Sequence, residues 1–224
     1  MHDGGLQRFA KYTNSKLAST SQQNLSSALS SMPGDARYSV IFADTLTMLF
    51  EGIARTVEIH QPLIETYYGP GRLTSILNFL QDECDKQSLR IFNEFRRTRN
   101  VKEKLDKVKD SVYGSGLSNT SMTGSFNNSD SKLEARELDH VLEEMALLQA
   151  RSEMYFKFVR KKAFADIDSN NDSTADNNDV DKKKIERQLL TCGLCQSVQE
   201  LMSDYIFFED FYMTQNIRYV NPCF

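Results

Sequence analysis

The sequence predicts an all-α protein, an extended up-and-down bundle of long helices (a helical rod) with two disordered polar loops. Apolar residues recur at three- and four-residue steps over long stretches, which places them on one face of a helix. No segment alternates apolar and polar residues with β-branched enrichment. The chain has 224 residues, of which 40% are hydrophobic, 26% are charged and only four are proline. This composition favours helices over a β-sandwich.

Three helices are predicted in the helical region 1–112. The first lies within 6–32 and is expected to fray or bend at the polar stretch 19–24. The second runs from about residue 36 to between 57 and 60, and the third continues from 70 to about 112. At ~1.5 Å per residue, a helix of about forty residues is a rod roughly 60 Å long. That length indicates an extended architecture.

A structural corner is predicted near residues 61–71, between the second and third helices. Pro62 removes a backbone donor, Gly69 and Gly71 permit positive φ, and Pro70 is preset for the first position of a helix. The free amides of this helix start could hold an anion, but the phosphate-loop and dinucleotide patterns are missing. We therefore interpret it as a corner with tyrosines packed beneath it, made of Pro62, Tyr67, Tyr68, Gly69, Pro70, Gly71 and Arg72.

The second half of the chain alternates predicted helices with polar segments. Residues 113–132 are rich in Ser, Asn and Gly and are expected to be a disordered linker. A helix at 133–165 follows, then an acidic disordered linker at 166–181 and a helix at 182–220. Residues 221–224 are expected to be an irregular tail.

The acidic linker partly matches a calcium-binding loop. Its residues at the first, third, fifth and seventh places are Asp166, Asp168, Asn170 and Asp172. However, Asn171 stands where the sharp turn needs Gly, and Asn177 where a bidentate Glu is needed. We favour a solvated linker, and a calcium-responsive or general helical adaptor is the alternative function.

The sequence offers no catalytic or cofactor site. Cys192 and Cys195 form a lone C-x-x-C without further ligands for zinc. They are predicted to be buried small residues inside a helix, whereas a redox pair would stand at a helix start. The three histidines have no nucleophile beside them, and the common catalytic motifs do not occur. We therefore expect no enzyme activity, no cofactor and no metal.

One helical segment carries an excess of cations. The candidate basic interaction face comprises Arg90, Arg96, Arg97, Arg99, Lys102 and Lys104. It could contact acidic lipid headgroups or an acidic partner. The alternative is a solvated face with internal pairs such as Glu103 with Lys107. The net charge of −4 argues against nucleic-acid binding.

The chain is predicted to be soluble and to bury its apolar faces in a larger assembly. No apolar run approaches the ~20 residues that a membrane span needs. A short rod is expected to leave several wide apolar stripes uncovered. Their large members are Leu49, Phe50, Ile53, Leu148, Tyr155, Phe156, Tyr205, Phe208 and Tyr212.

Three blocks of sequence resemble a known family, in the same order. They are IFADTLTMLFEGIARTVEIHQPLIETYYGPGRL, LDHVLEEMALLQARSEMYFKFVRKK and LMSDYIFFEDFYM. Together they resemble the subunit 4 family of the conserved oligomeric Golgi complex, a family of helical-rod tethering subunits. The resemblance covers residues 6 to about 216 and lapses in the two polar loops. Residues 221–224 depart from the family pattern.

The resemblance implies a function that the residues alone do not give. Family members are several times longer, so this chain is expected to be a part of the middle region. The implied role is a non-catalytic scaffold for tethering vesicles in intra-Golgi retrograde transport. The implied partners are other subunits of the complex and the membrane-fusion machinery. The implied location is the cytoplasmic face of the Golgi membrane, with peripheral rather than integral association.

Overall fold

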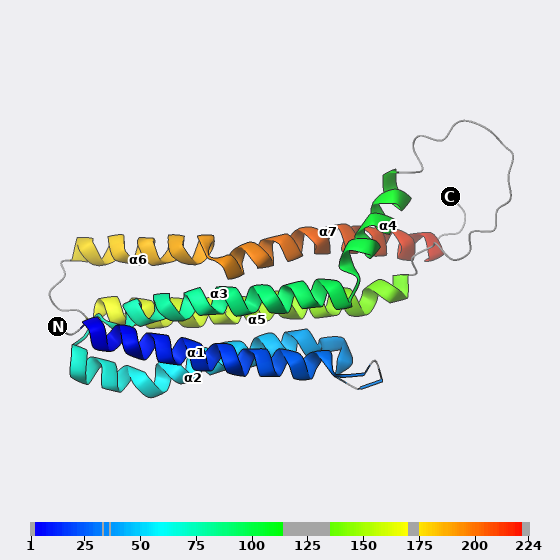
Figure 1. Cartoon of the computed structure of the whole chain (residues 1–224). Helices are drawn as coiled ribbons and strands as arrows, with labels where there is room; N and C mark the ends of the chain where they lie inside the picture. The colour runs from blue at the N-terminus through cyan, green and yellow to red at the C-terminus, as the bar shows by residue number, and fades with distance from the viewer. Residues whose placement is uncertain (1–2, 33, 36, 114–134, 170–174, 221–224) are drawn as a thin grey trace, which may run out of the picture.

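The computed structural model describes residues 3–32, 34–35, 37–113, 135–169 and 175–220. Within these ranges every regular element is helical, with seven α-helices, one 3-10 helix and no strand. The long helices lie side by side in an elongated bundle (Figure 1). The predicted all-α fold is therefore confirmed.

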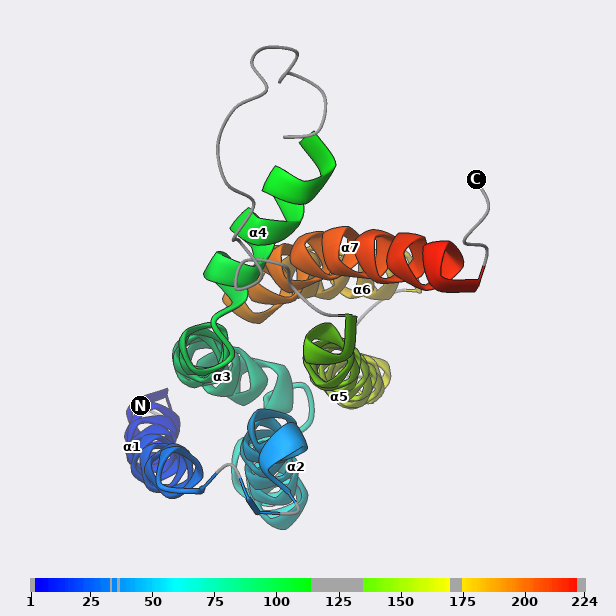
Figure 2. The same ribbon diagram turned by 90° about the vertical axis from the view of Figure 1, so that its right-hand side faces the viewer.

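The helices stack in three layers, which Figure 2 shows along the long axis. The first layer holds α1 and α2, the second α3 and α5, and the third α6 followed by α7. Contacts join α1 to α2 and α3, α2 to α5, and α7 to both α3 and α5. The elements are α1 (Asp3–Leu29), η1 (Tyr38–Val40), α2 (Ile41–Tyr68), α3 (Leu73–Thr98), α4 (Val101–Tyr113), α5 (Ala135–Asp168), α6 (Ala175–Thr191) and α7 (Gly193–Val220).

A single apolar core runs between the layers. Phe42 of α2 meets Phe95 of α3 edge to face, with ring centroids 5.9 Å apart. Phe50 of α2 stacks on Tyr155 of α5 at 4.4 Å. Phe208 of α7 is fully buried as well. The apolar stripes of α2, α5 and α7 are thus the surfaces that hold the bundle together.

The prediction that these stripes stay uncovered is wrong. Of the nine large residues that it named, Leu49, Phe50, Ile53, Leu148, Tyr155 and Phe208 are buried, and Phe156, Tyr205 and Tyr212 are half-buried against the core. The stacking of three layers gives each stripe a neighbouring helix to pack on. A simple row of antiparallel helices would not provide a neighbour for every stripe.

Helix α2 runs further than predicted. It continues through Pro62 to Tyr68, whereas the sequence predicted an end between residues 57 and 60. A proline inside a helix costs one backbone hydrogen bond, but the turn after Pro62 buries Ile64, which is 4% exposed. The corner is consequently confined to Gly69–Arg72.

Two helices predicted as continuous are broken. The predicted helix 70–112 ends at Thr98, and Asn100 adopts φ +51° before α4 departs from the bundle axis (Figure 1). Asparagine tolerates this left-handed conformation better than most residues. The predicted helix 182–220 is divided at Cys192 into α6 and α7. By contrast, α1 is one unbroken helix with no bend assigned at 19–24.

The two predicted linkers are only partly described. Residues 114–134 and 170–174 lie outside the described residues, so the prediction of disorder there is not examined. The ends of the predicted acidic linker are helical, because α5 reaches Asp168 and α6 begins at Ala175. In the described part of the chain, no helix is both long enough and apolar enough to cross a membrane.

Candidate functional site

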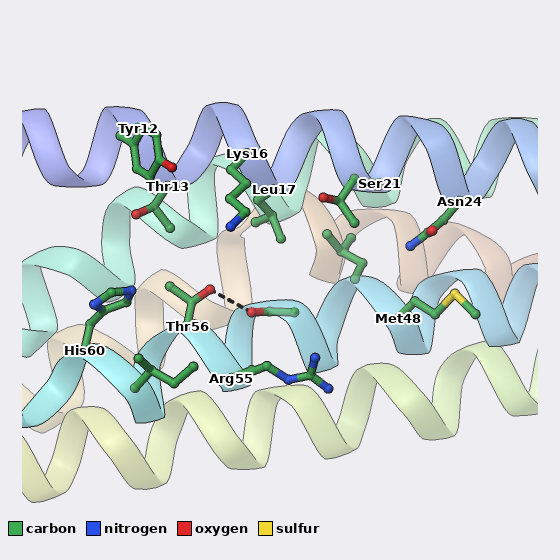
Figure 3. Close-up of a pocket in the computed structure, with 14 residues that line it drawn as sticks. Tyr12, Thr13, Lys16, Leu17, Ser21, Asn24, Met48, Arg55, Thr56 and His60 are labelled. Carbon is green, nitrogen blue, oxygen red and sulfur yellow. Dashed lines mark hydrogen bonds between the residues drawn. The ribbon is translucent and has the colours of Figure 1, made fainter.

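The outer side of the α1–α2 pair carries a cavity of about 330 Å³ (Figure 3). Leu17 of α1 and Leu49 of α2 are buried in its floor. Gly52 and short hydroxyl side chains keep it open. The lining residues are Tyr12, Thr13, Lys16, Leu17, Thr20, Ser21, Asn24, Met48, Leu49, Gly52, Arg55, Thr56, Ile59 and His60.

A second cavity of about 430 Å³ continues the first along the same pair of helices. Asn24 and Met48 line both cavities. The further lining residues are Ser27, Ala28, Ser31, Asp35, Arg37, Tyr38, Ile41, Asp44 and Thr45. We call the two cavities together the α1–α2 groove.

The charges of the α1–α2 groove are arranged unevenly. No carboxylate lines the first cavity among the described residues, and neither Lys16 nor Arg55 forms an ion pair there. Lys16 extends from α1 toward α2 and Arg55 lies along α2 (Figure 3). At the other end, Asp44 lies 3.7 Å from Arg37. The Asp35 carboxylate accepts a hydrogen bond from the Met32 N–H at 3.1 Å.

Two polar side chains of the groove are engaged within the bundle. Its one histidine, His60, packs edge-on against the Phe9 ring at a centroid distance of 4.7 Å. The hydroxyl of Thr56 donates to the Gly52 carbonyl at 2.8 Å, so it is engaged with its own helix (Figure 3). The groove therefore offers an apolar floor, hydroxyl groups, three cations (Lys16, Arg37 and Arg55) and two carboxylates (Asp35 and Asp44).

The corner between α2 and α3 is held by a carboxylate from α5. Gly69 and Gly71 have φ of +84° and +80°, as the sequence predicted for this turn. Asp166 accepts hydrogen bonds from the N–H of Gly71 at 3.1 Å, and from the N–H and hydroxyl of Thr74 at 2.8 Å each. Both carboxylate oxygens thus satisfy the open N-terminus of α3. The anion at this helix start is a side chain of the chain itself.

The other predicted corner residues are spread over different surroundings. Tyr68 is half-buried against the core, and a Cβ on Gly5 of α1 would meet its hydroxyl at 2.7 Å. Tyr67 is 71% exposed, so it does not pack beneath the corner as predicted. Pro62 lies inside α2, and Arg72 occupies the N-cap position of α3. Pro70 lies in the turn itself.

Two further carboxylates reach the start of a distant helix. Asp85 of α3 accepts hydrogen bonds from the N–H of Gly193 at 2.9 Å and of Leu194 at 3.0 Å, at the start of α7. Glu144 of α5 accepts one from the N–H of Phe42 at 2.9 Å, at the start of α2. Sequence reasoning missed both residues, because a carboxylate that caps a distant helix carries no local pattern.

The C-x-x-C pair stands at a helix start, not inside a helix as predicted. The N–H of Cys195 donates to Cys192 Sγ at 3.4 Å. Burial raises the pKa of the Cys192 thiol to about 12, and the negative charge of Asp85 adds to this increase. A redox-active pair needs a lowered thiol pKa. The environment of Cys192 has the opposite effect, and this argues against a redox role.

Several members of the predicted basic face make contacts within the chain. Arg99 pairs with the buried Glu144 at 2.8 Å, donates to the Tyr38 carbonyl and lies over the Tyr38 ring. Lys104 donates to the Arg99 carbonyl at 2.8 Å. These contacts place Arg99 and Lys104 in the joint between α3 and α4.

The remaining members of the basic face lie nearer the surface. Arg96 faces Glu200 of α7 at 3.1 Å. Arg97 pairs with Glu94 of its own helix at 2.6 Å, and Arg90 and Lys102 are exposed. A partner for this face stays a prediction.

The calcium-loop residues inside the described ranges have other partners. Asp166 and Asp168 belong to the last turn of α5 rather than to a loop. Asp166 caps α3, and Asp168 lies 2.6 Å from Lys182. Asn170 and Asp172 lie outside the described residues. Among the residues that are described, no group of three metal-ligating side chains could hold an ion.

Comparison with known proteins identifies what the chain is similar to. Residues 1–220 match the family model described as COG4 transport protein, middle alpha-helical bundle. The chain is 38% identical over 219 residues to mouse (Mus musculus) conserved oligomeric Golgi complex subunit 4, and 36% identical to the human (Homo sapiens) subunit. The Drosophila melanogaster subunit is 27% identical over 229 residues.

These relatives are much longer than the chain. The alignments cover 97% of the chain but 26% of the mouse and human proteins, and 96% of the chain but 29% of the Drosophila protein. No solved structure matches the chain.

Proposed function

Because this chain belongs to the family of the COG4 transport protein, as part of its middle alpha-helical bundle, we propose that it is a non-catalytic scaffold portion of a Golgi vesicle-tethering complex subunit. The observation that carries the proposal is the match over nearly the whole chain. The relatives are, by name, subunits of a Golgi complex. The chain acts through protein–protein contacts.

The structure supports a scaffold in its own terms. The bundle is elongated, and its helix starts are held from inside by Asp85, Glu144 and Asp166. A rigid elongated bundle of this kind can hold separate binding surfaces at fixed distances from one another. The two cavities of the α1–α2 groove lie on the outside and are lined by side chains suited to contact.

The finer assignment rests on the family resemblance of the sequence. The chain takes part in intra-Golgi retrograde vesicle transport, at the cytoplasmic face of the Golgi membrane. Its partners are other subunits of the tethering complex and the membrane-fusion machinery. Its association with the membrane is peripheral. The exposed Arg90 and Lys102 of the basic face contribute to contacts with acidic groups at that surface.

A calcium-responsive or general helical adaptor is the alternative. It would need the acidic stretch after α5 to be free for ligation. Asp166 and Asp168 are engaged with Thr74 and Lys182, which speaks against this alternative. Calcium titration separates the two functions, because only the adaptor requires a saturable site.

Affinity purification of the tagged chain from its own cells tests the proposal. We expect the other subunits of the Golgi complex to co-purify and the tagged chain to co-localise with a Golgi marker. An unrelated helical bundle of similar size, with the same tag, is the control. A chain that recruits no subunit of the complex and is spread through the cell would refute the proposal.

A further inference from the structure

We propose that the α1–α2 groove binds an α-helix of a partner protein whose acidic side chains face Lys16 and Arg55. The inference rests on the proposed scaffold function and names the surface and the chemistry of one contact. The groove lies between α1 and α2 on the outer face of the first layer. No described helix covers this side of the pair (Figure 2).

The dimensions of the α1–α2 groove suit a helix. On α1 its lining runs from Tyr12 to Ala28, which at ~1.5 Å per residue is about 24 Å, or roughly four helical turns. The lining includes the small residues Gly52, Ser27 and Ala28, whose side chains project little from α1 and α2. Small side chains at these positions let the side-chain ridge of another helix approach closely.

Three large apolar side chains of the groove are exposed in the described structure. Tyr12, Met48 and Ile59 are 69%, 50% and 59% exposed and stand along the rim, above the buried Leu17 and Leu49. Amphipathic helices bind in such grooves through anchors at helical spacing. An apolar floor between apolar rims fits a helix better than the flat surface of a lipid headgroup layer.

The charges of the groove determine which helix fits. Lys16 and Arg55 have no ion pair within the described chain, and no carboxylate lines their cavity. Of the two carboxylates at the other end, Asp44 is paired with Arg37, whereas Asp35 accepts from the neutral Met32 N–H and keeps its negative charge. The cavity around Lys16 and Arg55 has no carboxylate and is positive, and a helix with carboxylates facing these two residues complements it.

The groove is already formed without a partner. Asn14 of α1 donates to the Phe79 carbonyl of α3 at 2.8 Å, so α1 is fixed to the second layer. The adjoining Thr13, Leu17 and Ser21 are buried. A partner helix would not have to order α1 before binding, which reduces the entropic cost of association.

Site-specific photo-crosslinking in cells tests the inference. A photo-reactive amino acid replaces Thr20, an exposed residue of the groove, in the tagged chain. The control position is Leu190 of α6, which is 62% exposed and lies outside the groove. Mass spectrometry identifies the crosslinked peptide. We expect a helical segment of another protein, with at least one Asp or Glu beside the crosslink, only from the Thr20 position.

Charge reversal tests the role of the two cations. The double variant Lys16→Glu with Arg55→Glu should reduce the crosslink yield by about tenfold, since two attractions become repulsions. The matched control is Lys157→Glu with Lys161→Glu, two exposed lysines of α5 with the same change of charge. It should keep the yield of the original chain. Circular dichroism verifies that both variants are folded.

The outcomes separate this inference from the proposed function. A crosslink from Thr20 to a second copy of this chain, to a segment of the same longer polypeptide or to lipid would overturn the inference. So would the absence of any crosslink, or a yield unchanged by reversal at Lys16 and Arg55. If complex subunits still co-purify in those cases, the scaffold function stands. If no subunit co-purifies with the original chain, the function itself fails.

Discussion

The Asp166 carboxylate accepts a hydrogen bond of 2.8 Å from the backbone N–H of Thr74, a residue 92 positions earlier in the chain. The Thr74 hydroxyl and the Gly71 N–H donate to the same carboxylate. The last turn of α5 therefore supplies the cap that the start of α3 lacks locally, because Arg72 at the N-cap position makes no side-chain cap bond.

Asp166→Ala should lower the free energy of unfolding by about 2 kcal/mol. The change leaves the N–H groups of Gly71 and Thr74 without their acceptor in a half-buried place. Urea unfolding followed by circular dichroism measures it. Asp168→Ala is the matched control: Asp168 is about half exposed and, within the described residues, pairs with Lys182 alone, so its loss should cost less than about 0.5 kcal/mol. Equal costs for the two variants would contradict the cap.

Gly69→Val and Gly71→Val should each cost about 1–3 kcal/mol of unfolding free energy. Both glycines have φ near +80°, a conformation that strains any residue with a branched Cβ. Around Gly69 the cost is backbone strain alone, because nothing lies within 4 Å of an added Cβ. Thermal melting of the variants tests this, and an unchanged melting temperature would mean that the turn relaxes freely.

Gly52→Ala is the control for the glycine series. Gly52 lies inside α2, and an added Cβ would meet Leu17 Cδ1 at 3.4 Å, which is ordinary contact. Alanine also favours the helix by about 0.5–1 kcal/mol. This variant should therefore melt at the same temperature as the original chain or higher.

Glu144→Ala should lower the free energy of unfolding by about 3–5 kcal/mol, because it leaves Arg99 buried without its partner. The Glu144 side chain is 0% exposed and that of Arg99 is 11% exposed. The double variant Glu144→Leu with Arg99→Met removes both charges and should cost less than Glu144→Ala. A larger loss in the double variant would show that the pair itself stabilises the joint of α2, α3 and α5.

The stability contributed by Glu144 should fall as the pH rises. Burial raises the pKa of Glu144, although the hydrogen bond and charge of Arg99 and the N–H groups of Phe42 and Ala43 lower it. The folded state thus binds the proton more tightly than the unfolded state does. This proton-linked part of the stability is complete below the ordinary value of 4.5 and is lost as the pH rises through the folded value. The loss of Arg99's partner in Glu144→Ala is a separate effect.

Comparison with Glu144→Gln isolates this pH dependence, since glutamine does not titrate. The difference in unfolding free energy, original chain minus Glu144→Gln, should decrease as the pH rises from below 4.5 toward neutrality. Urea unfolding at several pH values measures the difference. An increase with pH would mean that Arg99 outweighs burial.

Cys192 should react slowly with iodoacetamide, because burial raises its pKa to about 12 and only the thiolate reacts. Asp85→Asn removes a charge that raises this pKa and keeps one acceptor for the start of α7. Alkylation of Cys192 should therefore become faster in this variant, as mass spectrometry of the labelled peptides would show. Asp82→Asn, an exposed neighbour on α3, should leave the rate unchanged. Equal rates in all three chains would exclude a role for Asp85.

The spacing of apolar residues determined which segments are helical and which face of each helix is apolar. Leu49, Ile53 and Leu148, which recur on these faces at three- and four-residue steps, lie in the core. These steps report on local backbone geometry, which depends on neighbours within one or two turns. The residues of the three sequence blocks likewise indicated the family without any structure.

Only the tertiary structure decided where helices end and which surfaces stay open. The end of α3 depends on Arg99 reaching Glu144, and the start of α7 on Asp85, partners 45 and more than 100 residues away. Pro62 did not end α2, because burial of Ile64 beyond it favours continued helix. The α1–α2 groove exists because α1 and α2 pack together and no third described helix packs over their outer side. A local sequence pattern contains none of these distances, since each depends on how remote helices satisfy one another's polar groups and apolar faces.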